Sequence, residues 1–186
     1  VTGDLYGGVS LGAGDVSGNS VFMDGTAQVT GDVYGGYARQ GDAYGNSVLV
    51  DGTTKVTGDV YGGFTQSGNA ATDNSITVRN GVDLADARLF GGGGNLSGDV
   101  FSGNTLNFEG FTGHVDEIAN FQTINVLVPS SVQNGGTVVT TDRLVLGAGP
   151  QPTDVNVSLG SGGRALRPGD HVPLIGSRAR TGASEG

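Results

Sequence analysis

The feature that most constrains this chain is an eight-residue motif that returns at a nearly fixed interval. Residues 1–8 read VTGDLYGG, residues 29–36 and 56–63 read VTGDVYGG, and residues 88–92 keep only the apolar pair and the glycines. The aromatic residues of the four copies stand at positions 6, 34, 61 and 90, so the interval is almost constant. Self-similarity at a fixed period indicates stacked units, each of which buries its apolar face against its neighbours. The repeat therefore favours an elongated scaffold over a globule built around one pocket.

A second motif runs in phase with the first and centres on an asparagine. Its four copies are Gly18-Asn19-Ser20-Val21, Gly45-Asn46-Ser47-Val48, Asp73-Asn74-Ser75-Ile76 and Gly103-Asn104-Thr105-Leu106. Helix is disfavoured in this region, because glycine recurs every few residues and costs about 1 kcal/mol at each helical position. No stretch shows the 3.6-residue periodicity of an amphipathic helix. We therefore expect short strands separated by glycine-rich turns.

Each repeat has room for three short strands. Ser47–Val50 and Lys55–Tyr61 flank the turn dipeptide Asp51-Gly52, and a third strand is expected after the Gly-Gly pair, at 63–66. Three strands and three corners in about 27 residues describe one coil of a parallel β-helix. The sequence thus predicts an all-β solenoid of stacked coils. A series of antiparallel hairpins that turn at the Asp-Gly pairs is the competing architecture.

Stacked coils place equivalent side chains in columns about 4.8 Å apart. The Gly-Gly pair that follows each aromatic residue fits a corner that needs positive φ or a close approach of the backbone. The predicted aromatic column contains Tyr6, Tyr34, Tyr61 and Phe90. The predicted amide column, whose side chains hydrogen-bond from one coil to the next, contains Asn19, Asn46, Asn74 and Asn104.

The composition indicates a folded chain of an unusual kind. Glycine supplies 37 of the 186 residues, against a usual share of about 7%. Disorder is the alternative for so much glycine, but the regularly placed Val, Ile, Leu, Tyr and Phe can offset chain entropy by burial. The formal net charge is −9, so nucleic acid and anionic membrane surfaces are poor partners. No cysteine is present, which excludes disulfides and thiolate metal sites.

The repeats end near residue 104, which divides the chain into three predicted regions. Residues 1–104 form the glycine-rich β-helix array, residues 105–178 an atypical C-terminal cap of further coils, and residues 179–186 a frayed tail. Between Val115 and Asn120 we expect a short helical or irregular link. The strands expected in the cap are Thr105–Phe108, Thr123–Val128, Thr137–Thr140, Val155–Leu159 and Gly169–Ile175.

Aligned aspartates are the first residues that suggest chemistry. Calcium takes six to eight oxygen ligands, and stacked aspartates with turn carbonyls would supply some of them. Solvated turn aspartates are the alternative, and we predict no metal and no cofactor. The two sets that the period would align are Asp4, Asp32 and Asp59 on one edge, and Asp15, Asp42 and Asp99 on another.

Other candidate residues carry weaker signals. His114 and His171 have no partner at ligand spacing and are expected to be ordinary strand or loop residues. Tyr37, Tyr44 and Phe64 either contact sugar or protein, or pack between coils, and packing is favoured. A polysaccharide-cleaving enzyme would need paired carboxylates, or carboxylates beside a basic residue, in a groove. The basic residues of the repeats are not in register with one another, so we predict no catalytic residue.

The motifs resemble those in the passenger region of bacterial autotransporters, the type V secretion family. The units VTGDVYGGY and GNSV are typical of its repeat segments. Residues 98–108, GDVFSGNTLNF, resemble its transition from repeats into the stretch that precedes the membrane barrel. Residues 113–129, with IANF and INVLVP, are also similar. The resemblance covers nearly all of residues 1–178.

The resemblance implies a right-handed β-helical stem that is exported through the outer membrane and displayed on, or released from, the cell surface. Its own C-terminal membrane barrel would lie outside this chain. Because the chain opens within a repeat, at Val1, we expect it to be a piece of a longer polypeptide. The more apolar residues 105–178 stand where the family's passengers nucleate folding. No motif of the family's protease members is matched.

We therefore expect an extracellular stem that adheres to host cells, to matrix or to copies of itself through many contacts along its coils. A pure spacer and folding nucleus, with the binding function elsewhere in the full-length protein, is the alternative. A polysaccharide-active β-helix enzyme is the third hypothesis.

Overall fold

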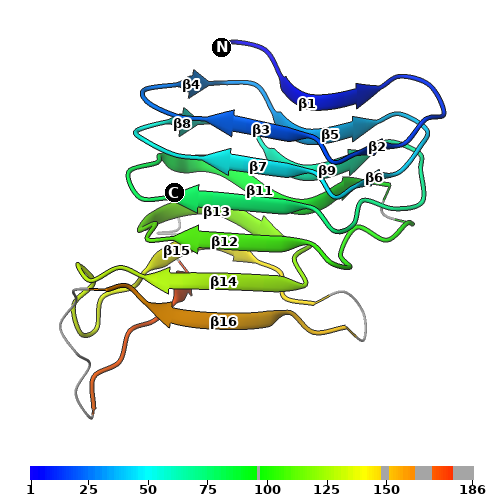
Figure 1. Cartoon of the computed structure of the whole chain (residues 1–186). Coiled ribbons are helices and arrows are strands. Elements are labelled where there is room, and N and C mark those ends of the chain that lie inside the picture. The colour runs from blue at the N-terminus through cyan, green and yellow to red at the C-terminus, as the bar shows by residue number, and fades with distance from the viewer. Residues whose placement is uncertain (96, 148–150, 162–168, 178–186) are drawn as a thin grey trace, which may run out of the picture.

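The chain folds into a β-solenoid of stacked coils. The computed structural model describes residues 1–95, 97–147, 151–161 and 169–177. Figure 1 shows the stack from β1 (Leu5–Ser10) at the N-terminal end to β16 (Asp154–Leu159) at the other. The strands pair in parallel with equivalent strands of neighbouring coils, and no helix occurs among the described residues. The predicted parallel solenoid is confirmed, and the antiparallel hairpin alternative is wrong.

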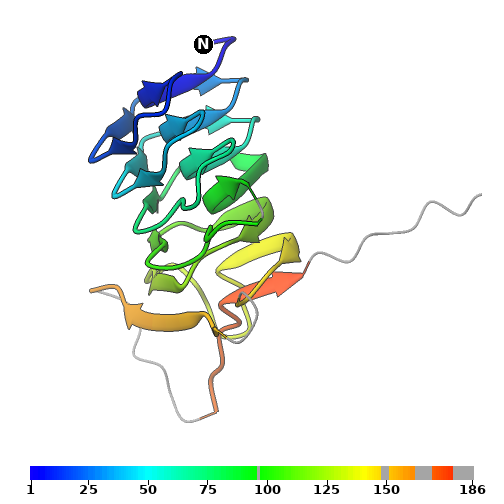
Figure 2. The ribbon, with the colours of Figure 1, turned by 90° about the vertical axis from the view of Figure 1, so that its right-hand side faces the viewer.

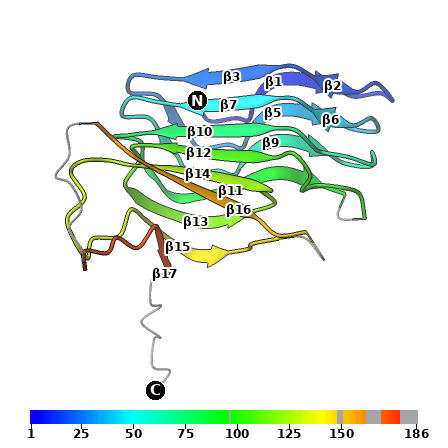
Figure 3. The ribbon, with the colours of Figure 1, turned by 60° about the horizontal axis from the view of Figure 1, so that its bottom comes forward.

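Two main sheets form the walls of the stack, and Figures 1 and 3 show their strands in stacked rows. The first sheet has seven strands, in the order β1, β5 (Val33–Ala38), β9 (Val60–Thr65), β11 (Leu84–Gly94), β13 (Gly113–Ala119), β15 (Val139–Leu144) and β17 (Ile175–Ser177). The second has six, in the order β16, β14 (Thr123–Val128), β12 (Thr105–Glu109), β10 (Ser75–Arg79), β7 (Ser47–Val50) and β3 (Ser20–Met23). Two-stranded sheets complete the first coils: β2 (Val16–Ser17) with β6 (Ala43–Tyr44), and β4 (Gln28–Val29) with β8 (Lys55–Val56).

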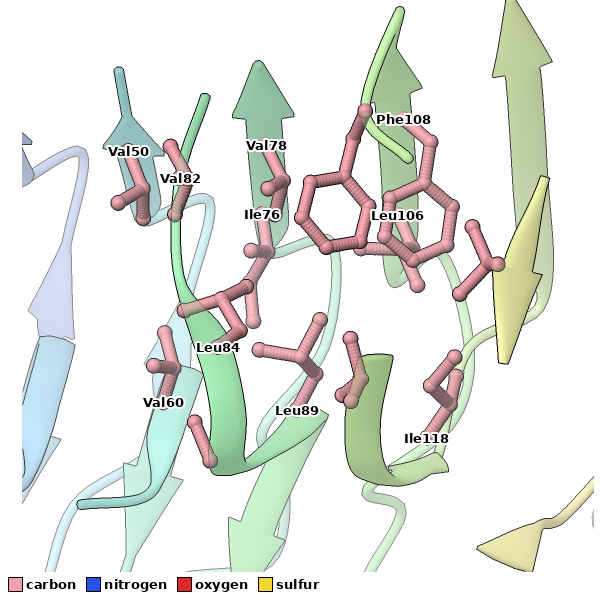
Figure 4. Packing of buried hydrophobic residues seen from close by; sticks show 14 of the residues in the cluster. Val50, Val60, Ile76, Val78, Val82, Leu84, Leu89, Leu106, Phe108 and Ile118 are labelled. Carbon is pink, nitrogen blue, oxygen red and sulfur yellow. The ribbon is translucent and has the colours of Figure 1, made fainter. Parts of the chain in front are cut away.

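The core is a continuous apolar column between the two main sheets. Side chains alternate along a strand, so Val33 points into the solenoid while Tyr34 points outward. Figure 4 shows the interior, where Val60, Leu89 and Ile118 of the first sheet face residues such as Ile76 of the second. Full burial of each such side chain contributes about 1.5–3 kcal/mol. Because each coil is narrow, this burial is made mainly against the coils above and below.

The Gly-Gly pair lies inside a strand and not at a corner. Gly35 and Gly36 belong to β5, and neither has a positive φ. A Cβ on Gly36 would stand 2.6 Å from the side-chain amide of Asn46, and one on Gly63 would stand 2.5 Å from that of Asn74. Of the two predicted roles, the corner is wrong and the close approach is right. Glycine leaves the space that the asparagine fills.

This placement also changes the predicted strands of the repeat. The strand expected at Lys55–Tyr61 is divided into β8 and β9, because the chain turns between them. Strand β9 runs through the Gly-Gly pair and takes in most of the separate strand expected at 63–66. Strand β7 has the bounds predicted for Ser47–Val50.

The four asparagines of the second motif lie in one column on the inner side of the Gly-Gly pairs. The Nδ2 groups of Asn19, Asn46 and Asn74 donate to the Oδ1 atom of the next asparagine at 3.1, 3.1 and 3.2 Å. Each of these oxygens also accepts the backbone N–H of the preceding asparagine, at 2.9–3.1 Å. The residue before each asparagine has a left-handed φ, which explains the glycine of Gly-Asn; Asp73, with φ of 56°, is the exception.

The coil narrows after the fourth repeat. Ser75 pairs with Thr105, one full repeat later, but Thr105 pairs with Thr123, which follows after a much shorter stretch of chain. The chain turns tightly at Asn120, with φ of 64°, and buried Phe121 occupies the interior beside this turn. Figure 2 shows that β16 and β15 then diverge at the end of the stack. The amide column ends at Asn104, whose Nδ2 donates to backbone carbonyls instead.

Several predictions for the cap need correction. The link expected at Val115–Asn120 is strand β13, because parallel pairing with β11 on one side and β15 on the other uses its backbone groups. The strand expected at Thr137–Thr140 begins and ends later, as β15. The strand expected at Gly169–Ile175 is misplaced: β17 (Ile175–Ser177) begins only at the last residue of that range. The predicted tail, residues 179–186, lies outside the described residues.

The close packing of glycine against amide predicts the effect of one methyl group. Gly63→Ala should destabilise the solenoid by about 1–3 kcal/mol, because the methyl needs space that Asn74 occupies. Gly12→Ala is the matched control: nothing lies within 4 Å of the added Cβ, so its effect should stay within about 0.5 kcal/mol. Urea unfolding followed by circular dichroism measures both. Equal stabilities would contradict the close packing.

Candidate functional site

The outer face of the seven-stranded sheet carries the aromatic residues of the repeat. Successive ring centroids of the main column lie 5.1 Å apart, with planes within 15° of parallel. A second column lies beside it and meets it edge to face, at 5.2–5.7 Å. Ring faces inside the columns therefore contact other rings. The structure brings the four predicted residues Tyr6, Tyr34, Tyr61 and Phe90 into the main column.

The second aromatic column answers the question left open for two of the three other rings. Tyr37 and Phe64 stack on each other at 5.3 Å, so they pack between coils. Tyr37 also donates its hydroxyl to Gln66 Oε1 at 3.2 Å. Tyr44 lies apart on β6 and is 43% exposed.

Each Gly-Asp-x-Tyr unit uses its carboxylate twice. In the second coil, Asp32 Oδ2 accepts the hydroxyl of Tyr34 at 3.1 Å, and Asp32 Oδ1 accepts the backbone N–H of Asp59 at 2.8 Å. Asp4 makes the same two bonds, with Tyr6 and with the N–H of Asp32. The aligned aspartates therefore tie one coil to the next.

The second predicted set of aspartates is only partly aligned. Asp15 Oδ1 accepts the N–H of Asp42 at 2.9 Å, and Asp42 Oδ1 accepts the N–H of Asn69 at 2.6 Å. The third position of this column is thus Asn69, while Asp99 pairs with Ala70 and lies outside it. Among the described residues, no group of three or more His, Cys, Asp or Glu side chains is placed to hold a metal ion. The carboxylates of Asp15 and Asp42 accept backbone N–H groups of the next coil.

At the fourth coil an arginine replaces the repeated aspartate. Leu89 pairs with Val60, which places Arg88 next to Asp59 in the column. Arg88 Nε donates to Asp59 Oδ1 at 2.7 Å, Arg88 Nη2 donates to Asp59 Oδ2, and the guanidinium carbon lies 5.6 Å from the ring centroid of Phe90. The charged column continues with a glutamate and a second arginine that bind each other. Its order is Asp4, Asp32, Asp59, Arg88, Glu117 and Arg143.

A second column of charged residues also changes from aspartate to arginine. It lies at the C-terminal ends of strands β7, β10 and β12 in the six-stranded sheet. Arg79 donates to Asp51 Oδ2 from Nη1 and to Glu109 Oε2 from Nε, each at 2.8 Å. The hydrogen bond from Arg79, followed by that from the N–H of Gly52, lowers the pKa of Asp51. Sequence reasoning missed both reversals. The signal in the sequence is an arginine at a position where the earlier repeats have an aspartate, which would have predicted an ion pair between neighbouring coils.

A surface hollow of about 420 Å³ opens beside the charged column. It is lined by Arg88, Asp116, Glu117, Asp142 and Arg143. Glu117 is 8% exposed and binds Arg143, so its charge is already balanced. The hollow is therefore a network of opposite charges and not an isolated pair of carboxylates.

The two histidines differ in their surroundings. His114 lies close to this network, with Nδ1 3.0 Å from Thr140 Oγ1 and Nε2 3.7 Å from Asp142 Oδ1. Its partners come from β15, the next coil, which is why spacing along the sequence did not reveal them. His171 is exposed, and its backbone N–H donates to Asn134 Oδ1 at 2.9 Å.

Sequence reasoning also missed a second amide column, on the outer face of the six-stranded sheet. Asn107 Nδ2 donates to Thr77 Oγ1 at 3.2 Å. Asn125 donates to Asn107 at 2.7 Å, and Asn156 donates to Asn125 at 3.0 Å. These pairs are 30, 18 and 31 residues apart along the chain, so the column has no fixed period from which it could be predicted.

Comparisons of the chain with protein-family models, with curated proteins and with solved structures find no match. In the part of the chain that the structure describes, no helix is long and apolar enough to cross a membrane. The function must therefore be inferred from the geometry of the aromatic, charged and amide columns.

The charge reversal at the fourth coil predicts a salt-dependent stability. Arg88→Gln should lower the free energy of unfolding by about 1 kcal/mol in low salt, because the carboxylate of Asp59 keeps the hydroxyl of Tyr61 but loses its cationic partner. Added salt should shrink this loss by screening the stacked carboxylates from one another. Arg39→Gln is the control, since Arg39 is exposed and forms no ion pair with a described residue. A loss that salt leaves unchanged would mean that packing on Phe90, and not charge, is the source.

The stacked tyrosines predict unfolding at alkaline pH. Burial, followed by the nearby carboxylates of Asp32 and Asp59, raises the pKa values of Tyr34 and Tyr61 above the ordinary value of 10.0. The unfolded chain then loses these phenol protons first, so stability is complete below about pH 10 and falls as the pH rises toward the folded-state pKa values.

Tyrosinate absorbance and circular dichroism, recorded together against pH, test this. We expect part of the tyrosine absorbance change to coincide with unfolding. The variant Tyr34→Phe/Tyr61→Phe keeps the stacked rings and should move the unfolding midpoint to higher pH. Titration of every tyrosine near pH 10 with the fold intact would refute the prediction.

Proposed function

We propose that this chain is an elongated structural stem, a segment of an autotransporter passenger region, whose function is to set a distance outside the cell. One observation supports this most: the side chains that repeat are used between coils. The carboxylate of Asp32 binds one tyrosine and one backbone N–H, and the amide of Asn46 binds neighbouring coils on both sides. The side chains that recur in each repeat therefore serve to hold neighbouring coils together.

The aromatic columns support a stem over a sugar-binding surface. Sugar rings are recognised by stacking on exposed aromatic faces. Here the faces of Tyr34 contact the rings of Tyr6 and Tyr61, and Tyr34 is only 8% exposed. The columns therefore offer ring edges and hydroxyl groups already bound to carboxylates, which gives a ligand little to hold.

The proposed setting follows from the resemblance to type V passengers. Export through the outer membrane, display at the cell surface, and a C-terminal membrane barrel as partner all belong to this proposal. A stack of coils suits such export, because each repeat coil bonds chiefly to its immediate neighbours along the chain and can fold as it emerges. The absence of cysteine is consistent with passage through an oxidising compartment.

Adhesion or self-association is the second candidate, and one observation favours it. Apolar side chains gather on the first coil, where Val9, Leu11 and Phe22 are 54%, 69% and 61% exposed. Polysaccharide cleavage has weaker support, because its best place is the charged hollow, where Glu117 is bound by Arg143.

Removal of one coil tests the stem proposal. Deleting residues 29–55 joins Gln28 to Val56, which takes the register position of Val29. Tyr6 should then stack on Tyr61, so the protein should still fold cooperatively and be shorter by about 4.8 Å. Small-angle scattering measures the length, and unfolding by denaturant measures the cooperativity.

Deleting residues 1–55 from the displayed protein removes the exposed apolar residues of the first coil together with the second coil, and it separates the two leading functions. A stem predicts shorter reach with unchanged attachment to the target surface. An adhesive array predicts loss of attachment while the shortened protein stays folded. That second result would overturn the stem proposal.

A further inference from the structure

One corner of the solenoid connects the six-stranded sheet to the seven-stranded sheet and recurs in neighbouring coils. It is formed by residues 24–32, 51–59 and 79–88, which we name the first, second and third corners. Strands β4 and β8 lie in the first two corners and pair with each other (Figure 1). At the third corner only an isolated bridge, between Lys55 and Asp83, continues this pairing. Backbone pairing is therefore less extensive between the second and third corners than between the first and second.

The third corner also differs from the second in length. Lys55 binds Asp83, which lies 28 residues later, whereas Asp59 binds Arg88, which lies 29 residues later. The third corner therefore contains one residue more than the second between these two contacts. An extra residue of this kind disrupts the pairing of the backbone around it. Contacts between side chains are therefore the main link between the second and third corners.

Those contacts are ion pairs that alternate in sign along the corner. From its beginning to its end, the second corner presents an acid, a base and an acid, whereas the third presents a base, an acid and a base. The pairs are Asp51 with Arg79 at 2.8 Å, Lys55 with Asp83 at 2.7 Å, and Asp59 with Arg88 at 2.7 Å. The two corners are therefore complementary in charge over their whole length.

The first corner carries the same acids as the second, but not the base. Its acids, Asp24 and Asp32, occupy the register positions of the two acids in the second corner. Gln28 occupies the register position of Lys55. If it lay against the third corner, the first corner would therefore offer two carboxylates and no cation.

Lys55 is the only lysine of the chain. Its hydrogen bond with Asp83 raises the pKa of Lys55 and lowers the pKa of Asp83. A second carboxylate of the third corner is also close, because Asp86 Oδ2 lies 3.7 Å from Lys55 Nζ. The lysine therefore offsets the repulsion between two carboxylates that belong to the neighbouring coil.

We propose that the second and third corners form a charge-coded junction, in which Lys55 determines which repeat coil lies against residues 79–88. The other contacts between coils do not distinguish the repeats, since Tyr34 and Tyr61 each stack on the next ring at 5.1 Å. Only the alternation of charge is particular to one corner. Charge patterns determine the choice of partner between paired helices in the same way. The coil with lysine therefore has a fixed place in the stack, and the coil with glutamine is suited to a place between repeat coils.

One substitution, made in two chains, tests this proposal. In the chain that lacks residues 29–55, Gln28 takes the register position of Lys55 beside Asp83. Gln28→Lys in that shortened chain should lower the unfolding equilibrium constant about threefold in about 0.01 M salt, because exposed ion pairs have modest effects. In the full chain the same substitution places two lysines side by side, so it should give no stabilisation. Urea unfolding followed by circular dichroism measures all four proteins.

A variant with exchanged residues controls for net charge. Gln28→Lys/Lys55→Gln in the full chain keeps the composition and moves the lysine by one coil. Its unfolding equilibrium constant should be about threefold larger than that of the unchanged chain in about 0.01 M salt, and the two should agree in about 1 M salt. This comparison does not depend on the folding of the shortened chain.

Two results would overturn the junction. One is equal stability of the exchanged variant and the unchanged chain in low salt. The other is stabilisation by Gln28→Lys in both the shortened and the full chain, because an added cation would then act through net charge alone. Neither result affects the stem proposal, which depends on length and attachment.

Discussion

The asparagine that fills the space left by a glycine pair sets the cross-section of the repeat coils. At Gly63 the nearest amide atom would lie 2.5 Å from an added Cβ, so the two sheets can meet there only with glycine on one side. The same asparagine, Asn74, is fully buried and accepts from Asn46 while donating to Asn104 and to the carbonyl of Ala43. An unpaired buried amide costs about 1–3 kcal/mol, so the ladder stabilises the stack only while every step is bonded. The two sequence motifs are thus the two halves of one contact.

A strict repeat also places the same charged side chain at the same position of every coil, so that like charges lie next to one another. Equivalent carboxylates about one coil spacing apart repel by about 1 kcal/mol in a water-like medium and by more near a protein surface. The backbone N–H of the following coil offsets this repulsion at Asp4 and Asp32. Arg79 in the third coil and Arg88 in the fourth then reverse the sign, on two different columns. Three successive coils can therefore carry an aspartate at the same position. Backbone hydrogen bonds to Asp4 and Asp32, and the guanidinium of Arg88 on Asp59, offset the repulsion between the carboxylates.

The fixed period allowed the columns to be predicted from the sequence, but it did not predict whether each residue is buried or exposed, or whether it lies in a strand or at a corner. Tyr34 and Asn46 could be placed in columns because their neighbours recur at the repeat interval. The Gly-Gly pair was ambiguous, since a tight corner and a close approach both require glycine. Asn107 and Asn125 escaped because the coil between them is much shorter than the coils of the repeat. Residues 115–120 were predicted to form a helical or irregular link because the partners of β13, strands β11 and β15, are distant in sequence, and pairing on both sides determines its strand conformation.

The amide ladder of the repeat array ends at its C-terminal side because the hydrogen bonds of the last asparagine change there. At the C-terminal side of the array, Asn104 turns its amide to the carbonyls of Ala71 and Val100, so that no donor is left for a further ladder step. Phe90 pairs with Ala119, so Asn120 and Phe121 then follow where the repeat coils have the Gly-Gly pair against which the asparagine packs. Within the array, by contrast, each asparagine donates its Nδ2 group to the oxygen of the next asparagine, and Asp4 and Asp32 each accept the backbone N–H of the next coil. The asparagine side chains therefore donate toward the C-terminal side of the stack, whereas the backbone N–H groups that bind the aspartates donate toward the N-terminal side. The order of the coils is therefore encoded in hydrogen-bond polarity as well as in shape.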